Sequence, residues 1–213
     1  MTCVIAGKAV IGIVGGIGSG KSFVADLFGE LGCFVSKSDE HVREAYLRPE
    51  VIKQVREWWG DSVLTPAGAV DRAAIARLVF SDSAQLKRLE GLLHPLVEEI
   101  RDAALSKALE NLQIKAIVWD TPLLYEVGLD KQCDAVVFVE APLDQRAQRV
   151  ARTRGWLPQE LTRREKLQLP LDKKREMAQY IVYNTADAAG ARRQVVAVLS
   201  RVLTKTLNAD PLG

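Results

Sequence analysis

The sequence is poor in cysteine and has no long apolar run. Its three cysteines, Cys3, Cys33 and Cys133, are far apart and lack metal-ligand spacing, so we expect small incidental thiols in a reducing compartment. No apolar run approaches the ~18 residues that a membrane span needs. Residues 1–7 are too short and too weakly charged for a signal peptide. These absences predict a cytoplasmic protein.

The chain also lacks a large excess of charge, internal repeats and low-complexity linkers. Its 213 residues include 29 basic and 27 acidic side chains, and a formal net charge of +2 gives no argument for nucleic acid or a membrane as partner. A hydrophobic content of 48% is ordinary for a globular protein. The length allows one substantial α/β domain, with room for a small inserted subdomain. We expect a monomer or small homo-oligomer.

Short β-branched runs alternate with helical patterns at both ends of the chain. Residues 9–14 predict a buried parallel strand, followed by a glycine-rich turn and a helix from Gly20 to about Leu31. A second strand at 33–35 completes the opening of a βαβ unit. Further strands and a last helix are predicted at 115–119, 135–139, 180–183 and 191–207.

The rest of the chain is helical in pattern. From Ser38 to about Leu112 we expect several helices, with Asp71 and Asp82 as N-caps. The helix after Asp71 is predicted to end at Phe80, and the one after Asp82 near His94. Pro95 is then predicted to lie in the first turn of a new helix. Residues 142–178 predict another helical region, dense in arginine and lysine.

A glycine-rich segment follows the first predicted strand. Residues 15–22, GGIGSGKS, fit the pattern G-x-x-x-x-G-K-[ST] at every position. Such a loop directs backbone N–H groups at phosphate, and the helix behind it adds partial positive charge. The pattern does not separate a kinase from an ATPase or a GTPase. We expect nucleotide phosphates to be bound by Gly16, Ile17, Gly18, Ser19, Gly20, Lys21 and Ser22, with Lys21 at the β- and γ-phosphates and Ser22 on Mg²⁺.

Two acidic residues follow predicted strands and should lie at the same edge of the sheet as this loop. Asp39 follows the second strand and could accept a proton from an acceptor hydroxyl, hold Mg²⁺ through water, or cap a helix. Arg43 lies one helical turn further on, where it could also form a surface ion pair with Asp39. Asp120 follows the third strand, as a metal-side acid does in P-loop enzymes, or caps the next turn.

Other polar residues have less specific patterns. His94 precedes Pro95 and follows an apolar pair, so a structural role and a substrate contact are both open. The basic residues between Arg146 and Arg175 suggest a lid that stabilises charge on a transferring phosphoryl group, or a solvated helical face. Composition does not identify which arginine would act.

Several segments together resemble the dephospho-CoA kinase family over residues 10–184. The loop at 15–22 is shared with other P-loop proteins, whereas two further segments are more specific. These two segments are LLHP at 92–95 and DTPLLYE at 120–126, supported by VDR at 70–72, QLPLDKK at 168–174, Ala178 and Asn184. The chain is thereby identified as similar to enzymes that phosphorylate the 3′-hydroxyl of the ribose of dephospho-CoA with ATP and Mg²⁺.

This resemblance implies a fold and a set of roles. It implies a three-layer α/β P-loop NTPase fold with a five-stranded parallel sheet, with the core at about 8–38, 114–145 and 179–207. A helical acceptor-binding insertion is expected at 39–113 and a small lid at 146–178. The expected catalytic residues are Asp39 as base, Lys21 and Arg149. The expected acceptor-binding residues are Asp39, Arg43, His94, Pro122, Leu123, Leu124 and Glu126, and the expected metal ligands are Ser22 and Asp120.

The sequence departs from the family pattern at a few places. Lys37 replaces the first of two acids that usually precede the second helix, and a cation there would favour ionised Asp39 and weaken it as a base. Thr153 stands where a second lid arginine is common, so Arg152 or Arg154 would have to substitute.

Two other functions share the phosphate loop. A GTPase switch would need the motif Asn-Lys-x-Asp, but residues 184–187 read NTAD and lack the lysine. A nucleoside monophosphate kinase shares the core, insertion and lid, and differs from a dephospho-CoA kinase in its acceptor. Phosphorylation of dephospho-CoA, and not of AMP, CMP or UMP, would separate these two.

Overall fold

A computed structural model describes residues 5, 7–79, 82–185 and 187–209. Within it the chain forms two compact units, one of residues 1–37 and 107–213 and the other of residues 38–106. Cys3 and the predicted helix end at Phe80 lie outside the described residues. Every helix in the described part is too short or too polar to cross a lipid bilayer.

The first unit contains a five-stranded sheet in the order β2-β3-β1-β4-β5. Every neighbouring pair of strands in this sheet is parallel, as the sequence predicts. The strands are β1 (Ala9–Gly15), β2 (Phe34–Lys37), β3 (Ala116–Asp120), β4 (Ala135–Glu140) and β5 (Tyr180–Tyr183). The α/β fold with this sheet is therefore confirmed, and the carboxyl end of the central strand β1 leads into the glycine-rich loop.

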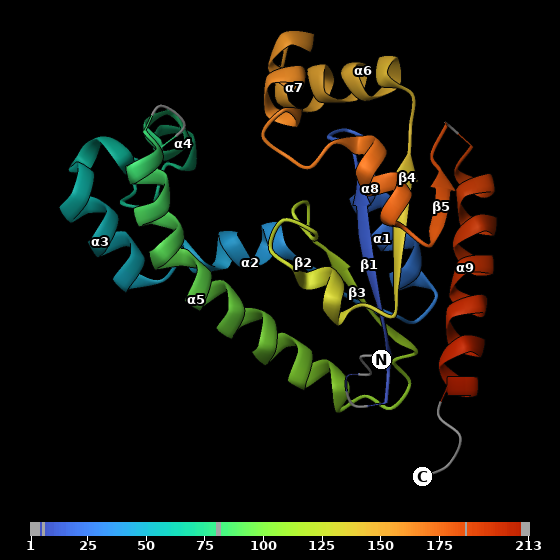
Figure 1. Ribbon diagram of the computed structural model, residues 1–213. Helices are drawn as coiled ribbons and strands as arrows, with labels where there is room; N and C mark the ends of the chain where they lie inside the picture. Colours follow the sequence, from blue (N-terminus) through green and yellow to red (C-terminus); the bar gives the residue numbers. More distant parts are fainter. Residues whose placement is uncertain (1–4, 6, 80–81, 186, 210–213) are drawn as a thin grey trace. The chain divides into compact units, whose positions relative to one another are not determined.

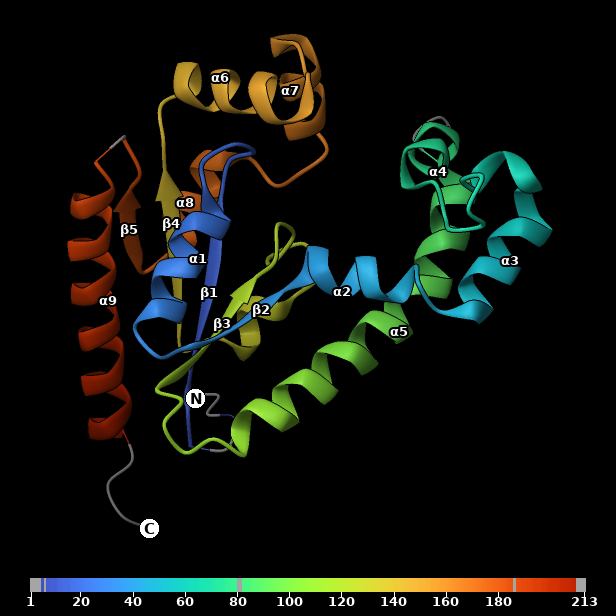
Figure 2. The ribbon, with the colours of Figure 1, turned by 180° about the vertical axis from the view of Figure 1, so that it is seen from behind.

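Helices cover this sheet because side chains on parallel strands alternate between its two faces. On one face Ile11 and Ile13 of β1 pack with apolar residues of α1 (Lys21–Glu30) and α9 (Ala188–Ala209). The other face is covered by α8 (Leu171–Met177) and by the segment after β3, which includes the short helix η2 (Leu129–Gln132). Figures 1 and 2 show α1 and α8 on opposite faces of β1. The predicted α/β layering is present.

Two further helices follow β4 in the first unit. They are α6 (Leu143–Arg154) and α7 (Pro158–Glu165), and together with α8 they make up the helical region predicted at 142–178. In Figures 1 and 2 both lie beyond the end of β1 where the glycine-rich loop begins. Side chains of α6 and α7 can therefore reach that loop.

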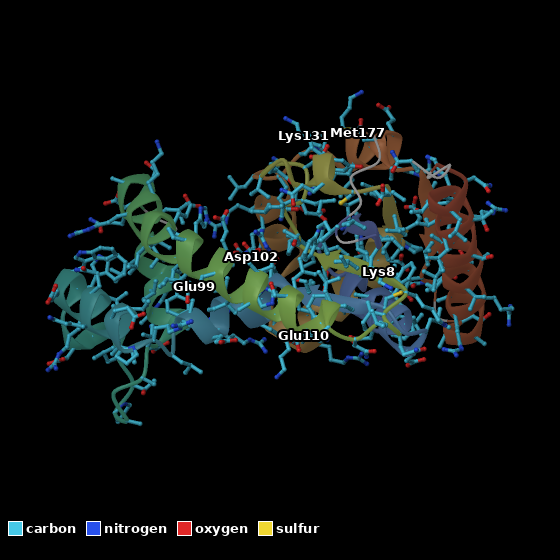
Figure 3. All side chains as sticks on the ribbon, turned by 90° about the horizontal axis from the view of Figure 1, so that it is seen from below. Lys8, Glu99, Asp102, Glu110, Lys131 and Met177 are labelled. Carbon is cyan, nitrogen blue, oxygen red and sulfur yellow. The ribbon has the colours of Figure 1, made fainter. Side chains whose placement is uncertain are left out.

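The second unit is helical and has a core of its own. Its elements are α2 (Ser38–Ala45), α3 (Pro49–Trp59), η1 (Asp61–Val63), α4 (Arg72–Val79) and most of α5 (Ser83–Leu109). Val51, Val55 and Ile75 are fully or almost fully buried in its apolar cluster. Glu99 of α5, labelled in Figure 3, forms an ion pair with Arg48.

The predicted N-caps are confirmed, whereas the predicted break at Pro95 is wrong. Asp71 Oδ1 accepts the N–H groups of Ala73 and Ala74, and Asp82 caps α5 in the same way. Helix α5 nevertheless runs through Pro95. Apolar residues on both sides of this proline pack into one cluster, and their burial outweighs the ~3 kcal/mol cost of an internal proline.

Candidate functional site

The glycine-rich loop joins β1 to α1 at the carboxyl edge of the sheet. Gly15, Gly18 and Gly20 have φ angles of 149°, 78° and 88°, which side-chain-bearing residues rarely adopt. Helix α1 begins at Lys21, directly behind the loop. The loop therefore combines a curled backbone with a helix N-terminus, the arrangement that binds phosphate in P-loop proteins.

Lys21 lies across this loop. Its Nζ donates to the carbonyl oxygens of Gly15 and Gly16, both at 3.0 Å. Burial lowers the pKa of Lys21 to about 8, although the nearby carboxylate of Asp120 acts in the opposite direction. Lys174 and Arg154 lower this pKa further. The ammonium group is thus held at the loop within the electrostatic reach of other charges.

Asp120 lies beside the loop, as the sequence predicts. It is the last residue of β3 and stands opposite Ile13 of β1 and Lys37 of β2 in the sheet register. Its side chain is buried, and its charge acts on Lys21. Ser22 is exposed in the first turn of α1. The acid predicted on the metal side is therefore at the correct edge of the sheet.

Two polar residues support the loop from outside. Arg149 of α6 donates from Nη1 to the carbonyl oxygens of Gly18 and Ser19, at 3.3 and 3.2 Å, and from Nη2 to the carbonyl of Asn184. The side chain of Asn184, just after β5, donates to Ser19 O at 2.8 Å. Arg149 thus contacts the loop backbone, and its expected action on the transferring phosphate stays a prediction.

A partly buried ion pair contacts the loop at Ile17. Glu165, the last residue of α7, accepts the Ile17 N–H at 3.0 Å and pairs with the guanidinium of Arg146 from α6. Arg146 also donates to Ile17 O at 3.3 Å. Both polar groups of one loop residue are therefore bonded by this pair.

The segment after β3 contains the other predicted acceptor residues of the first unit. Leu124 is fully buried, and a Cβ placed on Gly12 of β1 would lie 2.5 Å from its Cδ2 atom. Glu126 pairs at 2.9 Å with Lys174, a fully buried lysine that also donates to Pro122 O. Leu123 is exposed. Leu124 and Glu126 therefore pack and fix this segment, and their contact with an acceptor stays a prediction.

The remaining predicted acceptor residues belong to the second unit. Asp39 lies within the first turn of α2, which begins at Ser38, so it does not precede the helix as an N-cap. Asp39 and Arg43 are exposed and, within the described part of the chain, form no ion pair with each other. His94 is exposed on α5, so it is not a buried structural histidine. Their roles toward an acceptor stay predictions.

Lys37 stands where the family usually has an acid. It forms an ion pair within the first unit. Its Nζ lies 2.8 Å from Asp26 Oδ1 of α1. Asp26 follows Ser22 by four residues, and therefore lies one helical turn behind it. Part of the positive charge that the sequence places before Asp39 is thus compensated.

Four residues that contact the loop or its neighbours were not singled out from the sequence for these contacts. Arg146 and Glu165 lie in a long run of charged residues, in which a solvated surface is the commoner interpretation. Lys174 and Asn184 were named in segments of the family resemblance, without a contact to the loop or its neighbours. One feature of the sequence could have indicated the contact of Lys174. The other family segment contains an acidic residue, Glu126, with which Lys174 pairs.

Comparisons with known proteins agree with this geometry. The family model described as dephospho-CoA kinase matches residues 9–190. A dephospho-CoA kinase of Syntrophotalea carbinolica is 36% identical over 207 residues, covering 95% of this chain and 96% of the relative. One of Thermus thermophilus is 35% identical, covering 91% of each chain.

Solved structures have a similar fold. The crystal structure of TT1252 from Thermus thermophilus superposes with a TM-score of 0.76 at 34% identity, covering 91% of this chain and 97% of that one. A dephospho-CoA kinase from Campylobacter jejuni, 20% identical with a TM-score of 0.61 over 92% and 98% of the two chains, shares the fold. With a P-loop at the carboxyl edge of a parallel sheet and relatives that match nearly its whole length, the chain belongs to the dephospho-CoA kinase family.

Proposed function

We propose that this protein transfers the γ-phosphate of ATP to the 3′-hydroxyl of the ribose of dephospho-CoA and releases CoA and ADP. The observation that carries the proposal is the phosphate loop spanned by Lys21, with Asp120 at the same sheet edge, in a member of this family. We further propose that it acts in the cytoplasm as a monomer or small homo-oligomer.

The donor half of the reaction is assigned to the first unit. The N–H groups of Gly16 and of residues 18–22 bind the phosphates of ATP, whereas the Ile17 N–H is bonded to Glu165. Lys21 exchanges its contacts with Gly15 O and Gly16 O for phosphate oxygens. Lys21 then stabilises the negative charge that develops on the transferring group. Of the arginines that were candidates for the lid, Arg154 acts electrostatically on Lys21, which supports a role near the phosphates. Arg149 would first have to release the loop carbonyls.

Magnesium is assigned to Ser22 and Asp120. The described residues contain no group of three or more His, Cys, Asp or Glu side chains that could hold a metal. Mg²⁺ in kinases is bound by one or two protein oxygens together with substrate phosphates and water, so one hydroxyl and one carboxylate suit it. When bound, the ion neutralises charge on the donor phosphates.

The acceptor half is assigned to the helical insertion, 39–113, and to the segment after β3. Asp39 is proposed to take the proton from the 3′-hydroxyl, since its carboxylate is exposed on α2 and free to approach a substrate. Arg43 and His94 are proposed to bind the acceptor, together with residues 122–126. The region 146–178 is proposed to close over the phosphates as a lid.

The test is a coupled assay of the purified chain with Mg²⁺-ATP and separate acceptors. We expect 3′-phosphorylated product from dephospho-CoA and none from AMP, CMP or UMP. The Asp39→Asn variant should lower kcat by at least about 10²-fold, the scale of a lost general base. If folded protein gives no CoA, the proposal is wrong, and near-normal turnover of the variant would restrict Asp39 to positioning.

A further inference from the structure

Arg146 and Glu165 meet at the phosphate loop although both lie in a stretch of sequence that is typical of a charged helical surface. Arg146 is near the start of α6 and Glu165 ends α7, so the pair links two helices to one loop residue. The side chains are only 8% and 18% exposed. Ile17 N–H is bonded by Glu165, and Ile17 O by Arg146.

We propose that Arg146 and Glu165 are positioning residues that hold the Gly16–Ile17 segment in the shape that binds the donor phosphates. The inference builds on the donor site described under the proposed function. The two side chains bond the N–H and the C=O of Ile17 at once, so the peptide planes on either side of this residue cannot rotate freely. Rotation of these planes would change the directions of loop N–H groups that must converge on phosphate.

The charges of the pair explain why both members are needed. A carboxylate next to the site of a triphosphate would repel it, because few water molecules screen charges in a partly buried site. The guanidinium of Arg146 contacts the carboxylate directly and neutralises it. Glu165 can therefore accept a loop N–H without opposing the anionic ligand, provided that Arg146 is present.

The fit at Gly16 supports the same conclusion. A Cβ built on Gly16 would lie 2.6 Å from an Nη atom of Arg146 and 3.1 Å from an Oε atom of Glu165. The pair therefore packs against the loop backbone itself. A side chain at residue 16 would displace it.

The experiment measures binding of ADP by titration calorimetry, which needs no acceptor. Arg146→Met keeps an unbranched apolar stem but removes the guanidinium and leaves Glu165 uncompensated, and we expect ADP affinity to fall at least about tenfold. Arg146→Met/Glu165→Gln removes both charges and retains an acceptor for Ile17 N–H. We expect this double variant to recover to within about threefold of the unmodified protein.

The matched control is Arg192→Met, which removes an arginine from an exposed ion pair with Glu30 of α1. It should bind ADP as the unmodified protein does, because exposed pairs contribute little. In the kinase assay Arg146→Met should raise KM for ATP and leave KM for dephospho-CoA unchanged. A purely structural role would lower Tm without this difference between the two KM values.

Three results would overturn the inference. They are unchanged ADP affinity in folded Arg146→Met, a double variant no better than the single one, and equal changes in both KM values. If the unmodified chain binds ADP but does not phosphorylate dephospho-CoA, the proposed acceptor fails while the calorimetric test still decides the role of the pair. If the unmodified chain binds no ADP, the donor site itself is wrong.

Discussion

The phosphate loop and the segment after β3 leave neighbouring strands at the same edge of the sheet, yet they are held in different ways. The loop is rich in glycine, and side chains of other elements, such as Arg149 and Asn184, bond its backbone. The segment after β3 is held by its own side chains, Leu124 in the core and Glu126 on Lys174. A loop that must expose its backbone to a ligand has few side chains with which to anchor itself, and of these Lys21 bonds to its own loop. The loop's other support therefore comes from distant parts of the chain.

The largest effect is expected at Lys21 of the phosphate loop, where activity should fall while stability changes little. Lys21→Ala removes the cation that spans the loop, and we expect kcat/KM for ATP to fall by about 10³-fold or more, since a charge aimed at the transferring phosphate is lost. The free energy of unfolding should change little, because the variant also removes a desolvated charge. Steady-state kinetics and urea unfolding measure the two quantities. A large loss of stability with normal activity would contradict the prediction.

A change at the segment after β3 should instead lower the stability of the protein. Lys174→Met leaves the Glu126 carboxylate without its buried partner, and we expect the free energy of unfolding to fall by about 3 kcal/mol. The matched control is Lys173→Met on the same helix, whose exposed pair with Glu176 should contribute little to stability. Equal unfolding curves for the two variants would show that burial of Lys174 has no energetic consequence.

A smaller effect should follow loss of one support of the phosphate loop. Asn184→Ala removes the hydrogen bond to Ser19 O, while Arg149 still donates to the same oxygen. We expect a loss of about 1 kcal/mol in stability and a rise in KM for ATP of a few-fold, about the value of one hydrogen bond. Thermal unfolding and initial-rate measurements test this. A change in KM for dephospho-CoA alone would argue against support of the loop.

The smallest expected effect is the pH dependence of the segment after β3. Burial alone would raise the pKa of Glu126, but hydrogen bonds from Lys174 and the Leu169 N–H outweigh it and hold the pKa below 4.5. A carboxyl whose pKa is lower in the folded state stabilises that state above its unfolded pKa and loses this contribution as the pH falls through the folded pKa. The difference in unfolding free energy between the unmodified protein and Glu126→Gln should therefore shrink below pH 4.5. A difference that grows on acidification would reverse the sign of this argument.

The sequence predicts local features of the fold well and distant contacts poorly. Strands and the phosphate loop follow from short patterns, since a β-branched run or a glycine spacing is contained within a few residues. Asp71 and Asp82 were predicted as caps for the same reason. The break at Pro95 was wrong because packing of the whole helix α5 outweighed a local preference.

The candidate site shows the same limit. Asp120 could be placed because parallel strands end at one edge. The bonds of Ile17 with Arg146 and Glu165 could not be predicted, because Glu165 lies 148 residues further along the chain. Nothing in a run of charged residues marks which of them turns inward. A lysine without exposed surface, such as Lys174, contradicts the usual expectation for its residue type.

Gly12, in the middle of the central strand, has a consequence for how this chain can change over time. The methyl groups of Leu124 occupy the space that a side chain at residue 12 would need, and Cys133 Sγ lies 3.0 Å from the position of a Cβ. A larger residue at 12 should therefore be accepted more readily together with a smaller one at 124. The two positions should vary as a pair in selected libraries, so that Gly12→Ala is tolerated in a Leu124→Val background more often than alone. The size of the side chain allowed at this strand position therefore depends on the size of a side chain in a loop 112 residues further along the chain.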